Sequence, residues 1–168
     1  MERIALVDAA IDWIVSTRLS WFVTNYRWVW PLAESVHFCG LALLSGTVGL
    51  FDLRVLGVAK GIAPSTLHST LRWGVVGFGA SVITGIMFIS GAPDQYFYNE
   101  AFRLKAVFLV LMGANAALFY WREFAGIRTL GPYDDAPRST KIVAAASLVF
   151  LVAIMLCGRM ITFFRPPF

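Results

Sequence analysis

Four long apolar stretches constrain this chain more than any other feature of its sequence. They cover approximately residues 30–51, 68–90, 101–121 and 140–163. An α-helix rises about 1.5 Å per residue, so a stretch of about 20 residues crosses a hydrocarbon core of about 30 Å. The composition agrees, because 14% of the residues are charged, whereas soluble domains average about 25%. We therefore expect an all-α, polytopic membrane protein built as a four-transmembrane-helix bundle.

The sequence outside these stretches consists of an N-terminal segment, the loops and a short C-terminal end. The spans and their loops account for the 168 residues, so we expect a single integral membrane domain over residues 1–168. Apolar residues at helical spacing over about 3–17 predict an amphipathic helix that lies in the membrane interface. The aromatic segment LSWFVTNYRWVWP follows it, and we interpret this segment as an interfacial connector rather than a re-entrant piece.

The distribution of positive charge bears on partners and on orientation. The net charge of +4 is spread over loops and span ends, which is typical of contact with a lipid bilayer and excludes the basic face of a nucleic-acid-binding protein. The loops after the first and third spans carry several Lys and Arg, whereas the loop between the second and third spans has none before Arg103. By the positive-inside rule, both termini are expected outside.

Two ionisable residues, Glu34 and His37, lie one helical turn apart inside the first span. By the helical rise, His37 lies about 10 Å below the outer edge of the hydrocarbon core. Ionisable groups at such depth are costly and commonly functional. One interpretation is a histidine ligand to haem or to a metal ion, with Glu34 as orienting partner or proton relay. The other is a buried polar contact with Arg103 or Lys105 that joins helices.

Depth decides which residues can meet His37. The other histidine, His68, begins the second span at the inner edge, about 20 Å away along the membrane normal. Two histidines of one chain therefore cannot bind one haem iron, and we interpret His68 as an interfacial residue without a special role. The candidates that share the outer half with His37 are Met87, Arg103, Lys105, Met155 and Arg159.

These candidates have different chemistry. Arg103, Lys105 and Arg159 would neutralise haem propionates or a quinone oxygen, or else extend to lipid headgroups. Met87 or Met155 would supply a second axial ligand to haem. Thioether and thiolate groups also suit Cu(I), so a copper site at His37 is an alternative, although no Cys-x-x-Cys or Met-x-Met spacing supports it.

The stretch WPLAESVHFCGLALLSGTVGLFDLRVLG resembles a family of small bacterial inner-membrane proteins of unknown function. An aromatic-Pro pair, a Glu-Ser-x-His motif and an Asp-Leu-Arg-x-Leu-Gly ending carry the resemblance. The pieces RWGVVGFGASVITGIMF and YNEAFRLKAV extend it over most of the chain. It implies a bacterial inner-membrane location, hence periplasmic termini, and no activity.

A looser resemblance concerns small haem-b membrane proteins, including the haem-binding protoporphyrinogen oxidases of bacteria and the copper-resistance membrane domain. It rests on the single deep histidine, His37. The chain differs from four-helix cytochromes of the b561 type because it has no paired histidines, which argues against a two-haem electron wire.

The leading hypothesis is therefore a membrane redox protein that binds one haem b, or else a quinone, near the outer face. His37 would be the axial ligand, Glu34 and Lys105 the candidate catalytic residues, and a homo-oligomer would allow a second His37 to approach the same cofactor. The alternative is a non-enzymatic membrane module, either an accessory subunit or a small transporter of protons or of metal ions such as copper.

Overall fold

The computed structural model describes residues 5–164, and within them every regular element is a helix. The four longest run nearly antiparallel: α3 (Val29–Leu56), α4 (Pro64–Gly91), α6 (Glu100–Leu118) and α8 (Arg138–Met160). A π-helical turn, η1 (Phe119–Glu123), and α7 (Phe124–Ile127) continue α6, so the third span extends over Glu100–Ile127. The predicted all-α fold with four helices long and apolar enough to cross a membrane is confirmed.

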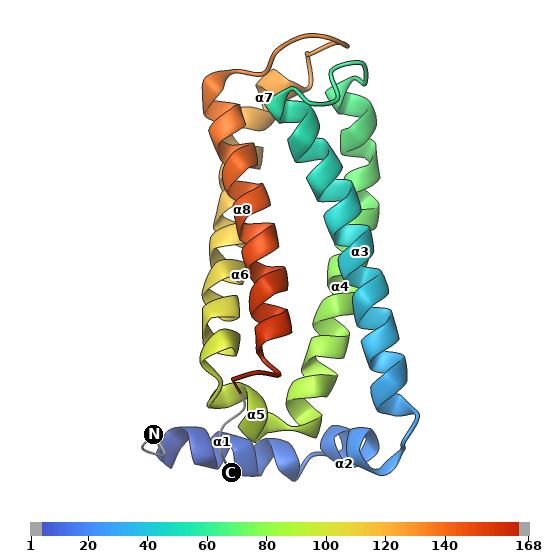
Figure 1. Cartoon of the computed structure of the whole chain (residues 1–168), viewed down its shortest axis with the longest axis vertical. Helices are drawn as coiled ribbons and strands as arrows, with labels where there is room; N and C mark the ends of the chain where they lie inside the picture. Colours follow the sequence, from blue (N-terminus) through green and yellow to red (C-terminus); the bar gives the residue numbers. More distant parts are fainter. Residues whose placement is uncertain (1–4, 165–168) are drawn as a thin grey trace.

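The helices are arranged as two pairs (Figure 1). α3 packs along α4, α6 packs along α8, and contacts between α3 and α8 join the pairs. Three short helices lie at one end of the bundle: α1 (Ala5–Val15), α2 (Arg18–Asn25) and α5 (Pro93–Phe97). We call this end the α1 end, and the opposite end, with the connections 57–63 and 128–137, the loop end.

Several element boundaries differ from the sequence-based expectation. The predicted connector contains a helix, α2, whose N-cap is the Thr17 side chain. The first long helix continues to Leu56 and ends at Gly57, so Asp52 and Arg54 lie inside it. The second begins at Pro64 with Ala63 as its N-cap, before the expected start at about residue 68. The predicted interfacial helix over 3–17 corresponds to α1, and its first residues lie outside the described range.

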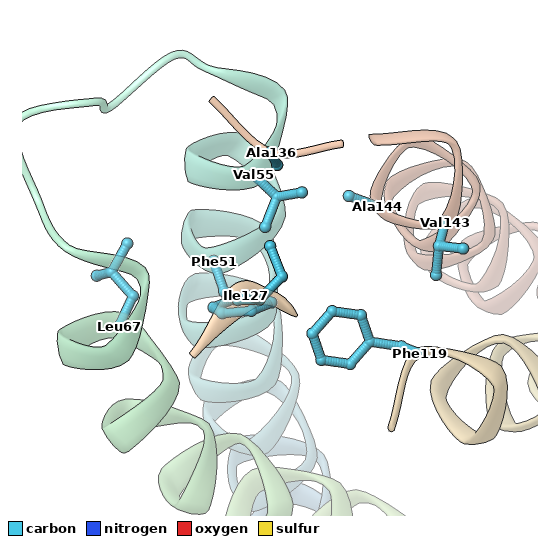
Figure 2. Close-up of a cluster of buried hydrophobic side chains, with 8 residues drawn as sticks. All are labelled: Phe51, Val55, Leu67, Phe119, Ile127, Ala136, Val143 and Ala144. Atoms are coloured by element: carbon cyan, nitrogen blue, oxygen red, sulfur yellow. The ribbon is translucent and has the colours of Figure 1, made fainter. Parts of the chain in front are cut away.

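The largest buried hydrophobic cluster lies at the loop end (Figure 2). Its members are Phe51, Val55, Leu67, Phe119, Ile127, Ala136, Val143 and Ala144. They come from all four spans and from the last connection, so the cluster ties the two helix pairs together where the loops leave the bundle.

Arg54 completes this end although it carries a charge. Its side chain is fully buried, with 0% of its surface exposed. The guanidinium donates to the carbonyl oxygens of Ile62, Gly131 and Asp134, so one residue of α3 binds both connections. Asp52, two residues before it, turns toward Ser147 of α8 instead.

Most of the bundle surface is apolar. In the most apolar window of the third span only 6% of the residues are buried, which a soluble protein would not tolerate. Asn115, deep in this span, donates to the carbonyl oxygen of Val143 in α8 over 3.0 Å. This hydrogen bond joins the third span to the fourth. The chain is a multi-pass membrane protein.

Candidate functional site

The site around His37 is built on a close crossing of α3 and α4. A Cβ atom added to Gly40 would lie 2.6 Å from the carbonyl oxygen of Gly77, and one added to Gly77 would lie 2.5 Å from that of Gly40. Only glycine permits such an approach of two backbones in a membrane bundle. His37 is three residues before Gly40, so its ring lies directly beside α4.

A threonine of α4 fixes the orientation of the His37 ring. Nδ1 of His37 lies 2.8 Å from Oγ1 of Thr84. The Thr84 hydroxyl has one proton, and its oxygen lies 2.8 Å from the carbonyl oxygen of Ala80 and 3.2 Å from that of Ser81 in its own helix. With that proton donated within α4, the tautomer of His37 that fits the contact carries its own proton on Nδ1 and donates to Oγ1 of Thr84. In this tautomer the lone pair of the neutral ring is on Nε2, and the ring also has a backbone hydrogen bond at Ser81.

Aromatic rings cover the same side of His37. Its ring meets that of Phe88 edge to face at 5.4 Å, and Phe88 in turn packs on Trp30 at 5.3 Å. The indole of Trp30 donates to the Glu34 carboxylate over 3.2 Å. Glu34 is exposed, so its carboxylate is connected to His37 through two aromatic side chains and makes no direct hydrogen bond to it.

Lys105 of α6 is the cationic residue that the fold brings close to His37. The lysine is partly buried and interacts electrostatically with the His37 ring. Its ammonium lies against α8, 3.5 Å from where a Cβ of Gly158 would be, and near Cys157. Within residues 5–164 this ammonium has neither an ion pair nor a hydrogen bond.

The other predicted site residues are distributed differently. Met155 is exposed, and its sulfur accepts from the Ser45 hydroxyl at 3.5 Å, about 12 Å deeper than His37 by the helical rise. Arg159 is exposed and lies over the Phe163 ring at 5.6 Å. Arg103 is exposed at the start of α6, whereas Met87 is partly buried one turn after Thr84. The structure therefore brings together His37 and Lys105 and adds Thr84.

A metal centre of the usual type is not formed by these residues. Within residues 5–164 there is no group of three or more His, Cys, Asp and Glu side chains that could hold a metal ion. The two cysteines are separate, Cys157 buried near Lys105 and Cys39 exposed. The arrangement around His37 offers one nitrogen ligand and one cation.

Sequence reasoning missed Thr84, and with it the feature that orients the candidate ligand. A threonine in an apolar helix carries no signal of its own, because its hydroxyl can be satisfied by a carbonyl of the preceding turn. Its position seven residues after Gly77 places it on the face of α4 that meets α3, but this is visible only once the crossing is known.

The second histidine has a more structured environment than its sequence position indicated. His68 stacks on Phe124 at 4.6 Å, and its Nε2 lies 3.3 Å from the Tyr120 hydroxyl. A cavity of about 250 Å³ opens beside it, lined by Ser65, His68, Phe124, Ile127 and Arg128. The interpretation of His68 as an interfacial residue without a special role stays a prediction, to which the structure adds these aromatic neighbours and the cavity.

Comparison with known proteins establishes the family. The sequence model of DUF6644, a family of unknown function, matches residues 10–164, which include all four long helices. The chain belongs to this family. The predicted membership in a family of unknown function is thereby confirmed. No curated protein and no solved structure matches the chain significantly, so a functional argument has to come from the residues themselves.

Proposed function

We propose that this protein is a redox protein of the bacterial inner membrane that holds one haem b through His37. The observation that carries the proposal is the contact of 2.8 Å between Nδ1 of His37 and Oγ1 of Thr84, which fits a ring that donates from Nδ1. Ligating histidines almost always donate their second ring N–H to a fixed acceptor, which sets the tautomer and directs Nε2 to the iron. His37 meets this requirement before any ligand is bound.

The other residues fit a single haem rather than a pair. Haem supplies one-electron chemistry, and the axial ligands and their surroundings tune its potential. Met155 is held by Ser45 away from His37, which leaves Met87, an open position, or His37 from a second copy of the chain as the sixth ligand. Lys105 would hold the negative charge of a propionate, a role that its lack of an anionic partner within residues 5–164 supports.

A quinone is the second candidate, favoured by the position of Lys105. Nε2 of His37 accepts hydrogen bonds and the Lys105 ammonium donates them, so the two groups complement the hydroxyl and carbonyl oxygens of a quinone headgroup. The ring would lie among apolar side chains from both helix pairs. Electron transfer through the membrane remains the function in this case, with the quinone in place of haem.

The proposed orientation puts the α1 end in the periplasm. Basic residues gather at the loop end, where Lys60, Arg128 and Lys141 lie in or beside the connections. Short loops rich in Lys and Arg stay on the cytoplasmic side. His37 and Lys105 would then lie toward the periplasmic leaflet, within reach of a redox partner on that side.

An absorption spectrum of the full chain purified in mild detergent tests the proposal. Expression with added haem precursor should give a Soret band that is lost in His37→Gln and kept in the matched control His68→Gln. Gel filtration and thermal melting of both variants show whether each is folded. A colourless wild-type protein would refute the haem version.

Quinone extraction from the same samples tests the second candidate. Co-purified quinone should fall in His37→Gln and in Lys105→Met but not in His68→Gln. A wild-type protein with neither haem nor quinone would overturn both versions and favour the non-enzymatic alternative, an accessory subunit or a small transporter.

A further inference from the structure

The cavity beside His68 lies at the depth of lipid headgroups. Ser65 and His68 stand at the start of the span Pro64–Gly91, and Ile127 ends the span Glu100–Ile127. The cavity, of about 250 Å³, is therefore at the edge of the apolar core, on the loop end of the bundle. Phosphate groups of a bilayer occupy this level.

The walls of the cavity differ in chemistry. Phe124 and the buried Ile127 form an apolar side. Ser65, His68 and Arg128 supply polar groups, and the Arg128 guanidinium lies over the Phe124 ring at 5.5 Å. A cation held against an aromatic face keeps its N–H groups directed outward from the ring edge. A ligand here would meet a cation on one side and hydrocarbon on the other.

No acidic side chain of this end neutralises Arg128. Glu123 accepts from Ser139 at 3.0 Å and from Thr140 in α8. Asp134 accepts from the backbone N–H of Gly131, and Asp135 binds Lys60 and Lys141. Within residues 5–164 the Arg128 guanidinium forms no ion pair. The negative charge that would complement it has to come from outside the chain.

The π-helical turn η1 directly precedes Phe124 and Ile127, which line the cavity. Its backbone N–H of Phe124 bonds to the carbonyl oxygen of Phe119, one residue further back than in an α-helix. Phe119 is thereby buried against Phe51 at 5.5 Å while Tyr120 and Phe124 both reach His68. Such turns occur frequently at functional sites.

We propose that this cavity binds a phosphate group, with Arg128 as its charge partner and Ser65 and His68 as hydrogen-bonding partners. An anionic phospholipid and free inorganic phosphate both offer this group. Basic pockets between spans bind lipid headgroups in this manner, and the apolar wall of Phe124 and Ile127 would contact the part of the lipid below its phosphate.

Lipid titration of the delipidated full chain, followed by native mass spectrometry, tests the site. Phosphatidylglycerol should bind about tenfold more tightly than phosphatidylcholine, because only the former has a net negative charge. Arg128→Gln should lower the affinity for phosphatidylglycerol about tenfold and so abolish the preference over phosphatidylcholine. The matched control is Arg138→Gln, since Arg138 is exposed at the same end and does not line the cavity.

Added inorganic phosphate distinguishes the two sources. If millimolar phosphate displaces phosphatidylglycerol from the wild type, the site recognises the phosphate group alone; if it does not, the lipid is the ligand. Equal losses in Arg128→Gln and Arg138→Gln, or equal binding of the two lipids, would overturn the proposal in favour of nonspecific attraction to the basic end. His68→Gln, with melting temperature as a check of folding, should weaken binding in the same direction by a smaller factor.

Discussion

The two histidines occupy opposite ends of the α3–α4 pair, and their surroundings differ in how the ring is held. At the α1 end, a hydroxyl already bonded to its own helix fixes His37 over 2.8 Å. At the loop end, His68 is held by stacking on Phe124 and by a longer hydrogen bond, 3.3 Å, to an exposed tyrosine. The first arrangement fixes the ring by a short hydrogen bond at Nδ1, whereas the second places the ring in the wall of a cavity.

The supports beneath the two regions differ as well. His37 depends on backbone contact between two glycines, for which no side-chain adjustment can compensate. His68 depends on an aromatic cluster and on Arg54, which binds the connections. We therefore expect small changes in backbone distance at the α1 end to lower the free energy of unfolding strongly. At the loop end, we expect the loss of hydrogen bonds to lower it.

The largest effect is expected from Gly77→Ala. Its new methyl group would lie 2.5 Å from the carbonyl oxygen of Gly40, which forces α3 and α4 apart and should lower the free energy of unfolding by about 3 kcal/mol. Unfolding in SDS, followed by tryptophan fluorescence, measures this. Gly79→Ala is the control, because a Cβ there meets nothing within 4 Å. Equal stability of the two variants would show that the crossing is not tight.

Arg54→Met tests the loop end. The variant removes the donors to three carbonyl oxygens from a fully buried position, so we expect a loss of about 2 kcal/mol. Limited proteolysis should show faster cleavage in 128–137, while any ligand bound at His37 is retained. Simultaneous loss of that ligand would mean that the two regions are not independent; Arg138→Met serves as the exposed control.

Thr84→Val tests whether the Thr84 hydroxyl orients the His37 ring. Valine has a similar shape but leaves Nδ1–H without its acceptor, so the affinity for a ligand at Nε2 should fall about tenfold and the free energy of unfolding by about 1 kcal/mol. Titration of the ligand into the purified variant measures the first effect. Thr84→Ser, which keeps the hydroxyl, should restore binding, and a failure to do so would assign the effect to packing.

Tyr120→Phe is the corresponding change at His68, and its effect should be smaller. The hydrogen bond is long and exposed, so its removal should cost no more than about 0.5 kcal/mol, while stacking of His68 on Phe124 persists. Thermal melting beside Thr84→Val provides a direct comparison. A larger loss in Tyr120→Phe than in Thr84→Val would reverse our ranking of the two regions.

The smallest effect concerns Asp135, in the connection 128–137. Hydrogen bonds from Lys60 and from Lys141, together with their charges, lower the pKa of its carboxyl from the ordinary value of 3.8. Because the pKa is lower in the folded state, the carboxylate stabilises that state fully at a pH above the ordinary pKa. This contribution is lost as the pH falls through the lower, folded-state pKa. Melting of the wild type and Asp135→Asn should therefore differ slightly at pH 7 and converge in acid. A difference that grows on acidification would contradict this assignment.

The sequence was sufficient for the spans because hydrophobic length and charge depletion act locally. It also placed His37 and His68 at opposite ends, since the helical rise converts residue number into depth. It did not place Asp52 and Arg54 inside α3, because their partners, Ser147 and the carbonyls of distant connections, are joined only by the fold.

The candidate site was predicted only in part, because residue number gives depth in the membrane but not the contacts between helices. Lys105 was placed at the depth of His37 by residue number alone, and the structure gives the two side chains an electrostatic interaction. Met155 was expected at the depth of His37, but its sulfur contacts Ser45, about 12 Å deeper along α3, because the relative heights of α3 and α8 are set by the fold. Thr84 and the cavity at His68 depend on the glycine crossing and on a π-helical turn, neither of which has a reliable sequence pattern.

The π-helical turn also sets the rotational phase of everything that follows it in the third span. Each residue of an α-helix advances the chain by about 100° around the axis. Deleting one residue between Phe119 and Glu123 would allow a regular α-helix to form there and would turn Ile127 and Arg128 away from His68. The α1 end, on the other side of the membrane, would keep its geometry. The extra residue of the π-helical turn therefore sets the orientation of side chains at the loop end alone.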